Sequence, residues 1–600
     1  MFPTPLARSL RTFLAVGRTV QTARLNMTSS AVNVRPVESN GPKKRPGDGR
    51  TSYRFKNKKQ KSNQTLQSTG SNEEVLLAEV RALLEKQTLE DPPAKDSAEE
   101  NGNSNSTKPA LPEQFSEIKL DISELSSTGD GLALSPDSKH VYVVPFTAPG
   151  DVVKAKIFKH FSKNSYSLTD FIEVVKPSPH RDESLVKCPY FATCSGCQFQ
   201  MLPYHFQLAH KKTIVEKAYQ NFSNLDPNLV PAVGDTIGSP MEYGYRTKLT
   251  PHFDGPPGAR SDRRRGIQRV FESVPPIGFM KKGTRTTIDI EDCPIGTEAV
   301  RLGMKRERKR VADELSTYKR GATLLLRENT KRVPKGDMNE SKAEDTDDSS
   351  KDVVIEDRGN YIHKKTCITD PNSKSTEYVD DFAFVNPAGS FFQNNNSILP
   401  SFTSYIRDHI LPPYSTGSKI ANLIDAYSGS GLFTITLSSL FTRSLGIDIS
   451  ASSIECAKSN ARLNKLPESQ ANFIAADAAN LFASITFPGD ETVVVIDPPR
   501  KGCDESFLRQ LLRYSPARVV YVSCNVHTQA RDVGLLVGGM KGVDGGFGPG
   551  NGAYEIESLR GFDFFPQTGH VEGVAVLRRK TTEESLEEKK TVEVPATAAE

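Results

Sequence analysis

Short runs in which apolar and polar residues alternate occupy the stretch from about residue 115 to residue 175. Alternation with a period of two is the pattern of a half-buried β-strand, and Gly, Pro and Asp interrupt it where tight turns are needed. Several such runs close together are typical of a small β-barrel of the oligonucleotide-binding kind, although a generic β-domain also fits. The expected strands are Ile118–Leu120, Gly131–Ser135, His140–Val144, Asp151–Phe158 and Ser165–Val175.

The C-terminal third has a different pattern, in which continuous apolar runs are separated by segments with helical spacing. Strands that are buried on both faces of a parallel sheet have this composition, so the pattern predicts a doubly wound α/β sheet. The expected strands are Ala421–Asp425, Ser444–Ile449, Ala471–Ala476, Glu491–Ile496 and Ala517–Ser523. In such sheets, ligands bind beyond the carboxyl ends of the strands.

A glycine turn after the first of these strands is the leading candidate for a cofactor site. The stretch Ala421–Ser438 reads ANLIDAYSGSGLFTITLS, and its Gly429 and Gly431 allow the backbone to approach a ligand closely. Asp448 ends the second strand, where a carboxylate can accept hydrogen bonds from the two hydroxyls of a ribose. Because the third glycine of the dinucleotide fingerprint is missing, an ordinary strand–helix turn would explain this pattern too.

Further polar residues are expected at the same edge of the sheet. Gln393 precedes a helix just before the sheet, and Asp477 follows the third strand, where it could meet an adenine amino group. The fourth strand runs into Asp497, the first residue of DPPR, and acid-Pro-Pro elements are typical of nucleobase methyltransferases. The prolines restrict a backbone that must approach a flat base.

A thiol and a carboxyl group suggest the reaction. Cys524 follows the fifth strand and is a candidate nucleophile, although a buried structural cysteine is the commoner outcome. The run GFDFFPQTGHVEG brings Asp563, His570 and Glu572 toward the same edge. Thiolate addition to C6 of uracil activates C5 toward a methyl group, and a base must then remove the C5 proton. Cys524, Glu572 and the turn Asp425–Gly431 could supply the nucleophile, the base and an S-adenosylmethionine site.

Cysteine spacing indicates a second kind of site. The chain has eight cysteines, and their spacing suggests a reducing compartment rather than a disulfide scaffold. Cys188, Cys194 and Cys197 form a C-x5-C-x2-C cluster, and the distant Cys293 offers a fourth thiolate. Such a set can hold an iron–sulfur cluster or zinc, and uncoordinated buried thiols are the alternative.

Charge is unevenly distributed along the chain, although the net charge is only +4. Residues 1–37 contain arginines but no acidic residue, which suits a mitochondrial presequence or a disordered tail. The segment Gly41–Lys61 is strongly basic and could be a nuclear address or an RNA-binding arm. Cations beside aromatic residues in Tyr245–Lys248 and Arg260–Arg269 suit contacts with RNA, although such charges are more often simply solvated. No apolar run approaches the length that spans a bilayer.

Together these motifs resemble the S-adenosylmethionine-dependent RNA uracil-C5 methyltransferases, over residues from about 115 to 578. Within that family, the whole chain is most similar to the fungal tRNA (uracil-54-C5) methyltransferases. The phrases SSTGDGLA and VPFTAPGDVVKAKI resemble the TRAM domain, an RNA-binding barrel. The matching elements are CPYFATCSGCQFQ, YRTK, FFQNNN, DAYSGSGLF, GIDIS, DPPRKG, VYVSCN and FDFFPQTGHVE.

The resemblance implies a class I Rossmann-like methyltransferase domain, an N-terminal TRAM/OB-like β-barrel and a central cysteine-cluster domain. It implies that Cys524 is the nucleophile, that Glu572 is the proton acceptor, and that uridine 54 of tRNA is the substrate. Some members hold a four-iron (4Fe-4S) cluster with the equivalents of the four cysteines named above. The residues implied to line the cofactor site are Gln393, Tyr427, Asp448 and Asp497. One departure is Val526 where the family usually has proline, which we expect to loosen the nucleophile turn.

These expectations divide the chain into six parts. A disordered N-terminal region with one helical run near Glu73–Lys86 precedes the barrel, and further disorder is expected in an acidic insertion and in the C-terminal tail. No membrane or obligate protein partner is indicated, and the protein is expected in the mitochondrion, the nucleus or both. The expected ranges are 1–113 for the N-terminal region, 114–178 for the barrel, 179–335 for the central domain, 336–359 for the insertion, 377–578 for the methyltransferase domain and 579–600 for the tail.

Three other functions compete with this interpretation. An RNA cytosine-C5 methyltransferase would need a second cysteine near the prolines, and Cys503 is the only one suitably placed, although Arg500 stands where such enzymes have cysteine. An adenine N-methyltransferase would have an aromatic residue after the prolines and would need no nucleophilic cysteine. A tRNA-binding folding factor is a third alternative, and that role could coexist with methylation.

Overall fold

The structure is a computed structural model, and it describes residues 69–90, 111–258, 269–337, 352–412, 419–477, 481–482, 485–540, 542–543 and 552–581. The expected presequence, the basic arm and almost all of the expected C-terminal tail lie outside these residues, as does most of Arg260–Arg269. Within the described ranges, no helix is both long enough and apolar enough to cross a membrane.

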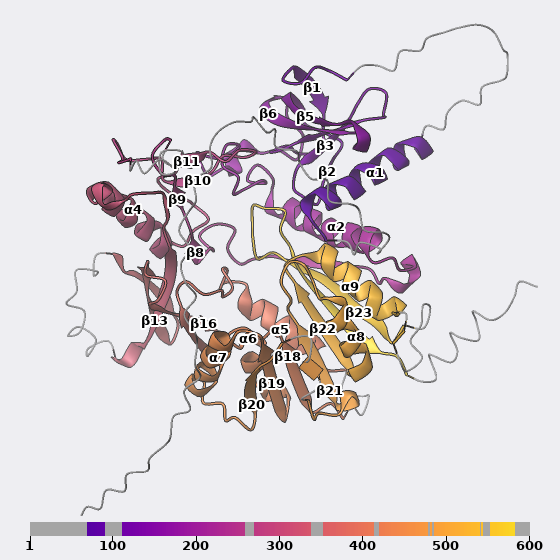
Figure 1. Cartoon of the computed structure of the whole chain (residues 1–600), viewed down its shortest axis with the longest axis vertical. Helices are drawn as coiled ribbons and strands as arrows, with labels where there is room; N and C mark the ends of the chain where they lie inside the picture. Colours follow the sequence, from indigo (N-terminus) through magenta and orange to yellow (C-terminus); the bar gives the residue numbers. More distant parts are fainter. Residues whose placement is uncertain are drawn as a thin grey trace, which may run out of the picture. The chain divides into compact units, whose positions relative to one another are not determined.

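An eight-stranded sheet contains all five strands expected in the C-terminal third. Its order is β20 (Ala471–Ala475), β19 (Arg443–Asp448), β18 (Asn422–Ala426), β21 (Thr492–Ile496), β22 (Arg518–Ser523), β24 (Glu572–Arg579), β23 (Tyr554–Phe562) and β7 (Gly234–Ile237). The strands from β20 to β22 are parallel, whereas β24 runs antiparallel to both β22 and β23 (Figure 1). The doubly wound α/β prediction is therefore confirmed, with an antiparallel extension at one side.

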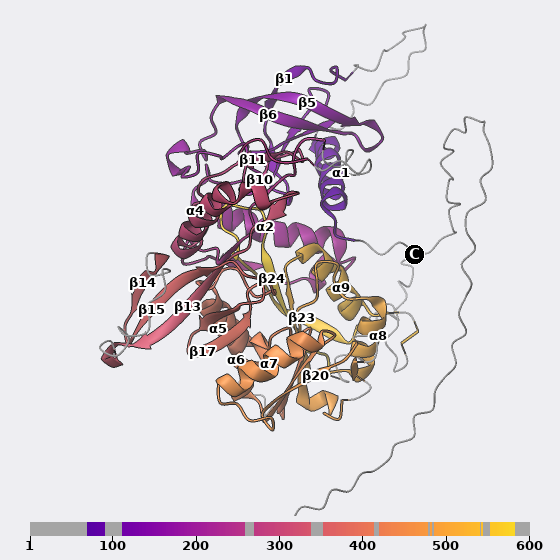
Figure 2. The same cartoon turned by 60° about the vertical axis from the view of Figure 1, so that its left-hand side comes forward.

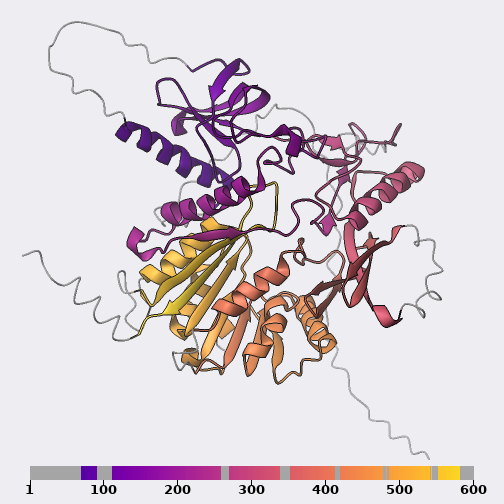
Figure 3. The same cartoon turned by 180° about the vertical axis from the view of Figure 1, so that it is seen from behind.

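Helices cover both faces of this sheet, which explains why its strands are continuously apolar. On β21, Val493 and Val495 belong to one core and Val494 and Ile496 to the other. In the view from behind, the yellow C-terminal strands continue the orange ones as a single sheet (Figure 3). One face carries α5 (Leu399–His409), α6 (Leu432–Thr436) and α7 (Ala451–Leu463), and the other carries α2 (Tyr204–Phe222), α8 (Glu505–Tyr514) and α9 (Val526–Gly538).

The sheet extends beyond the expected methyltransferase domain. The expected start of that domain, residue 377, is too late in the chain, because β7 pairs with β23 and α2 packs against α9. Close packing supports this arrangement, since a Cβ on Gly534 of α9 would lie 1.9 Å from the carbonyl oxygen of Ser223. Sequence patterns show that a helix has an apolar face, but they do not show which sheet it covers.

The N-terminal β-domain, residues 117–176, confirms the five strands expected there. Its sheet has the order β1 (Glu117–Asp121), β5 (Val152–Phe161), β6 (Tyr166–Lys176), β4 (Val141–Val144), β3 (Gly131–Leu134) and β2 (Glu124–Leu125). Only the two-residue β2 was not expected, because so short a strand leaves no periodic pattern.

The central region consists of small antiparallel sheets beside α4 (Glu298–Asp313) (Figure 2). The expected disordered insertion, 336–359, is partly wrong: residues 338–351 lie outside the described ranges, but Val354–Arg358 forms β14 and pairs with β15. The first sheet has the order β14, β15 (Tyr361–Ile368), β13 (Leu326–Pro334) and β8 (Lys248–Leu249). The second has the order β11 (Thr287–Asp289), β10 (Gly278–Met280), β9 (His252–Phe253) and β12 (Ala322–Thr323), and β16 (Lys374–Val379) pairs with β17 (Phe382–Pro387).

The expected helical run near Glu73–Lys86 is confirmed as α1, Asn72–Glu90. Val75 joins the core beneath α2 and α9, while Val80 packs against the N-terminal β-domain. Between them the buried Glu79 accepts hydrogen bonds from the amide nitrogen and the Oγ of Ser127. Helix α1 therefore contacts both the β-domain and the large sheet's helical layer.

We expect Val80→Ala to weaken the docking of α1 by about 2 kcal/mol, because it removes two buried methyl groups and leaves a cavity. Hydrogen exchange of the α1 amides should then be faster by about thirtyfold. Arg81→Ala, at the next and exposed position, is the matched control and should change exchange little. Equal exchange rates in the two variants would contradict the docked position of α1.

Candidate active site

A cavity of about 960 Å³ lies beyond the carboxyl ends of β18, β19, β21 and β22. Its wall combines the glycine turn, the DPPR turn and Cys524 with residues of the cysteine cluster. The predicted site residues that line it are Cys188, Cys194, Cys197, Cys293, Gln393, Tyr427, Gly429, Asp448, Asp497, Cys524 and Glu572. Segments that are far apart in sequence thus meet where the sheet was expected to bind ligands.

The glycine turn leaves one part of this cavity open. Tyr427 and Gly429 both have positive φ, 67° and 54°, and the Gly429 amide donates a 3.1 Å hydrogen bond to Oδ2 of Asp448. Among the described residues, none has an atom within 4 Å of the position that a Cβ on Gly429 would occupy. Behind the turn, Oδ2 of Asp425 accepts hydrogen bonds from the amide and the hydroxyl of Thr434, which ties β18 to α6. The turn is therefore a rigid cradle with free space above it.

The nucleophile turn is held by the residue after Cys524. The side chain of Asn525 caps α9 by accepting from the amide of His527. Its Nδ2 also donates to the carbonyl oxygen of Arg500, at 3.0 Å, and to that of Gly70, at 3.1 Å. Asn525 thus fixes the Cys524 turn against the DPPR turn and against the segment that leads into α1.

The acidic surroundings of Cys524 disfavour its thiolate. Burial raises the pKa of Cys524 to about 12, and the nearby carboxyl groups of Glu572 and Asp497 contribute to that rise. The guanidinium group of Arg500 acts in the opposite direction, because a cation and a hydrogen bond both favour the thiolate. The free site at neutral pH therefore contains a protonated thiol.

The two carboxyl groups are also perturbed. Glu572 has only 3% of its surface exposed, and burial raises its pKa well above the ordinary range, with a further contribution from Asp497. Burial also raises the pKa of Asp497 to about 7, and Asp425 adds to this shift. Arg500 again opposes the effect at Glu572. Raised carboxyl pKa values in a cavity are typical of groups that transfer protons.

The four cysteines of the cluster line another part of the cavity wall. All four are free thiols, and they come from the loop 188–197 and from Cys293. Burial raises the pKa of Cys197 to about 12, and the neighbouring Cys188 and Cys194 raise it further. Over the described ranges, no group of three or more His, Cys, Asp or Glu side chains stands in a metal-binding arrangement. The four thiols therefore line the same part of the cavity but do not have the geometry of a metal site.

Two of the expected cofactor residues do not line the cavity, as far as the described residues show. Gly431, with φ of 92°, is the N-cap residue just before α6, so its role is in the turn itself, and Asp477 is exposed after β20. Cys503, the nucleophile of the cytosine alternative, is 3% exposed and packs in the core, where its Sγ lies 3.7 Å from the hydroxyl of Tyr521. Its position therefore disfavours that alternative.

Sequence reasoning treated Arg500 only as evidence against other enzymes and missed its place beside Cys524. The acid-Pro-Pro element could have indicated this position. Two prolines restrict the backbone at the strand end and so fix the direction in which the next residue, Arg500, leaves it. His570 does line the cavity, as expected, whereas Asp563 is buried away from it and pairs with Lys211.

We expect Arg500→Gln to slow the alkylation of Cys524 by iodoacetamide, because removal of the cation raises the pKa of the thiol further. The pH at which the alkylation rate begins to rise should increase. Each increase of one pH unit corresponds to a tenfold lower rate at a fixed pH below the pKa. Mass spectrometry of the Cys524 peptide gives the rate. Lys501→Gln removes the neighbouring exposed cation and should leave the profile unchanged. A profile that moves to lower pH in the Arg500 variant would refute this electrostatic role.

Comparison with known proteins agrees with this geometry. Residues 339–580 match the family described as tRNA (Uracil-5-)-methyltransferase, and residues 113–164 match the TRAM domain. The chain is similar to the tRNA (uracil(54)-C(5))-methyltransferase of Schizosaccharomyces pombe, with 44% identity over 85% of this chain and 84% of the relative. It is also similar to the enzyme of the same description from Saccharomyces cerevisiae, with 40% identity over 80% of this chain and 76% of that one.

A solved structure shares the fold. The crystal structure of Pyrococcus abyssi tRNA (uracil-54, C5)-methyltransferase in complex with S-adenosyl-L-homocysteine matches with a TM-score of 0.51 and 22% identity, over 77% of this chain and all of that one. The N-terminal β-domain is therefore a TRAM domain, as expected, and the large sheet has the fold of a methyltransferase. On its identity to the fungal enzymes over most of both chains, this protein belongs to the tRNA (uracil-5-)-methyltransferase family.

Proposed function

We propose that this protein transfers a methyl group from S-adenosylmethionine to C5 of uridine 54 in tRNA. One observation carries the proposal: Cys524 and Glu572 face the same cavity as the glycine turn. Ser523 of β22 pairs with Gly573 of β24 in antiparallel register, so Cys524, which follows β22, and Glu572, which begins β24, are the next two residues opposite each other. The choice of tRNA and of position 54 is supported by the fungal relatives.

The residues of the glycine turn fit S-adenosylmethionine. The open space above Gly429 admits a ligand close to the backbone, and the carboxyl groups of Asp448 and Asp497 line the same cavity. A carboxylate at the end of the second strand suits ribose hydroxyls. When bound, S-adenosylmethionine supplies a methyl group on a positively charged sulfur, and the acidic residues around the cavity suit that charge.

The chemical steps follow from the two reactive side chains. Cys524 loses its proton to water, with Arg500 stabilising the thiolate, and its sulfur forms a bond to C6 of the uracil. The displaced electron pair makes C5 a carbanion, which takes the methyl group as the bond from that methyl to the sulfonium sulfur breaks. Ionised Glu572 then removes the C5 proton, the C5–C6 double bond re-forms and the Cys524 thiolate leaves.

Contacts with tRNA are proposed for one part of the cavity wall and for the TRAM domain. Arg246 lies over the ring of Phe565, with 5.5 Å from its guanidinium carbon to the ring centroid, and both residues line the cavity beside Lys248. Cations and aromatic rings together suit phosphates and unstacked bases. The target uridine must leave its stack before Cys524 can reach C6.

We also propose that the N-terminal segments direct the protein to the mitochondrion, the nucleus or both. Residues 1–37 have the composition of a presequence, and Gly41–Lys61 is a basic run. This part of the proposal rests on sequence alone, because both segments lie outside the described residues.

A metal centre is a further part of the proposal. Four thiols from two segments are the donor set of a 4Fe-4S cluster, and all four line the same cavity. A bound cluster would require all four as thiolates and would join the loop 188–197 to Cys293.

We therefore expect anaerobically purified protein to contain iron and sulfide and to absorb broadly in the visible range. Cys194→Ser should lose the iron and destabilise the central region. Cys456→Ser changes a cysteine outside the cluster and should keep the metal. Stoichiometric zinc without iron would refute the iron–sulfur assignment.

The two catalytic roles can be separated on a denaturing gel with labelled tRNA. Cys524→Ala should bind tRNA but form no covalent adduct and transfer no methyl group, because C5 is never activated. Glu572→Gln should still methylate and then accumulate a methylated protein–RNA adduct, because elimination requires removal of the C5 proton. Cys503→Ala is the control and should form and resolve the adduct normally. Near-normal turnover by Cys524→Ala would disprove the assignment.

A further inference from the structure

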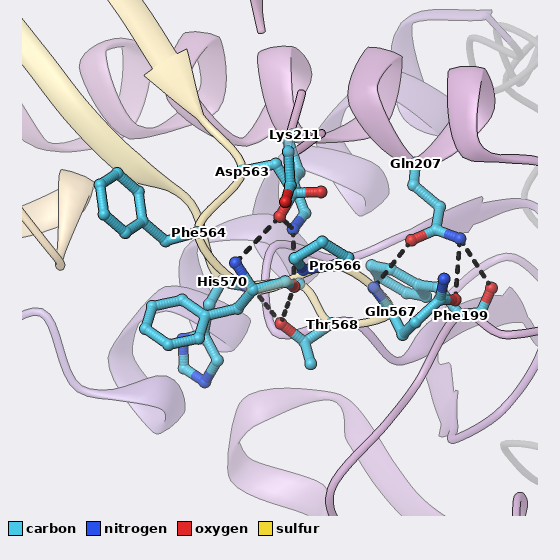
Figure 4. A network of polar contacts seen from close by, with 12 residues as sticks. Phe199, Gln207, Lys211, Asp563, Phe564, Pro566, Gln567, Thr568 and His570 are labelled. Carbon is cyan, nitrogen blue, oxygen red and sulfur yellow. Dashed lines mark hydrogen bonds and ion pairs between the residues drawn. The ribbon is translucent and has the colours of Figure 1, made fainter. Parts of the chain in front are cut away.

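The loop that leads to Glu572 is held by a network of buried and partly buried polar contacts (Figure 4). This loop, residues 563–571, connects β23 to β24, and Glu572 is the first residue of β24. Its partners come from α2 and from the cysteine-containing loop, which sequence analysis did not connect with catalysis. The backbone path of the loop decides where the Glu572 carboxyl group lies.

A buried ion pair fixes the start of the loop. Lys211 of α2 pairs with Asp563, and both side chains are 0% exposed. Nζ of Lys211 also donates a 3.0 Å hydrogen bond to the carbonyl oxygen of Phe565, and Oδ1 of Asp563 accepts from the Phe565 amide at 3.1 Å. Buried charges are tolerated when they are paired and hydrogen-bonded in this way. One lysine thus holds two positions of the loop, 563 and 565.

A glutamine one turn away fixes the middle of the loop. Nε2 of Gln207 donates to Oε1 of Gln567, and Oε1 of Gln207 accepts from the Gln567 amide, both at 3.0 Å. Gln567 has φ of 71°, a left-handed conformation that residues with a Cβ seldom adopt. The reciprocal pair, seen at the right of Figure 4, stabilises that conformation.

A third residue connects the loop to the cysteine cluster and to the TRAM domain. Gln198, next to Cys197, accepts from the amide of Gly569 at 3.0 Å and donates to the carbonyl oxygen of Thr128 at 2.7 Å. The backbone amide of Gln198 donates a hydrogen bond to the carbonyl oxygen of Gln567. Gln198 therefore touches the Glu572 loop and the TRAM domain at once.

We propose that Gln198, Gln207 and Lys211 form a latch that positions Glu572 for removal of the C5 proton. The proposal rests on the proposed role of Glu572 as proton acceptor. Proton transfer requires hydrogen-bond reach, and displacements of about 1 Å are enough to cost a hundredfold in rate. Because methyl transfer precedes proton removal, a loosened latch slows the last step more than the earlier ones.

This order of steps separates positioning from simple stability. A variant that only unfolds more easily lowers methyl transfer and adduct resolution together, since both scale with the amount of folded enzyme. A variant that displaces Glu572 leaves methyl transfer close to normal and delays release of the RNA. The fraction of RNA held as methylated adduct therefore measures whether Glu572 is correctly positioned.

The experiment uses the full chain, with Gln207→Leu and Gln198→Ala as the main variants, because neither leaves a buried charge unpaired. Single-turnover methyl transfer is measured with labelled S-adenosylmethionine and adduct resolution on denaturing gels. We expect methyl transfer within about threefold of the unaltered protein, and resolution slower by about tenfold or more. Lys211→Met should show the same pattern in its folded fraction, which circular dichroism measures.

The matched control is Lys212→Met, the adjacent residue of α2, whose 2.9 Å pair with Asp235 is on the surface. It should resolve the adduct at the normal rate. If methyl transfer and resolution fall together in the latch variants, the latch is overturned. Glu572→Gln distinguishes the two proposals: if it traps adduct and the latch variants do not, only the latch fails, whereas no trapping by Glu572→Gln refutes the role of Glu572 itself.

Discussion

The antiparallel pairing of β22 with β24 is the constraint on which the site depends. Four neighbouring parallel strands would direct their carboxyl ends to one edge in any doubly wound sheet. The parallel strands supply residues to that edge from their carboxyl ends, whereas β24, antiparallel to β22, supplies Glu572 there as the residue that begins a strand. The pair Ser523 and Gly573 fixes this register, so the end of one strand and the start of the next meet.

That arrangement concentrates ionisable groups where water is scarce. The cavity gathers Cys524, Glu572 and Asp497 around a single arginine of the DPPR turn, and burial raises the pKa of each of the three. Arg500 opposes the rise in pKa at two of them, since its positive charge favours both the Cys524 thiolate and the ionised Glu572. Burial thus favours the neutral forms of these three groups, and Arg500 favours the charged forms of Cys524 and Glu572.

Sequence patterns predicted the individual helices and strands of this fold better than they predicted which of them pack together. The apolar runs located the five parallel strands from β20 to β22, because burial on both faces leaves a strong local signal. They could not show that β7 and α2 join that sheet, since pairing between distant segments leaves no periodic trace in either. The same limit explains the expected role of Asp477: a carboxylate after a strand has the right position, but its exposure depends on neighbours that the sequence does not reveal.

The nucleophile turn shows how a local departure is compensated by distant contacts. Val526 in place of proline was expected to loosen the turn, yet Val526 is 2% exposed in the core and begins α9. The adjacent Asn525 donates to the carbonyl oxygens of both Arg500 and Gly70. Gly70 leads directly into α1, which lies outside both sequence ranges that match known domains. A segment before the recognisable domains therefore supports the turn that presents Cys524, and the catalytic scaffold extends to the beginning of the described chain.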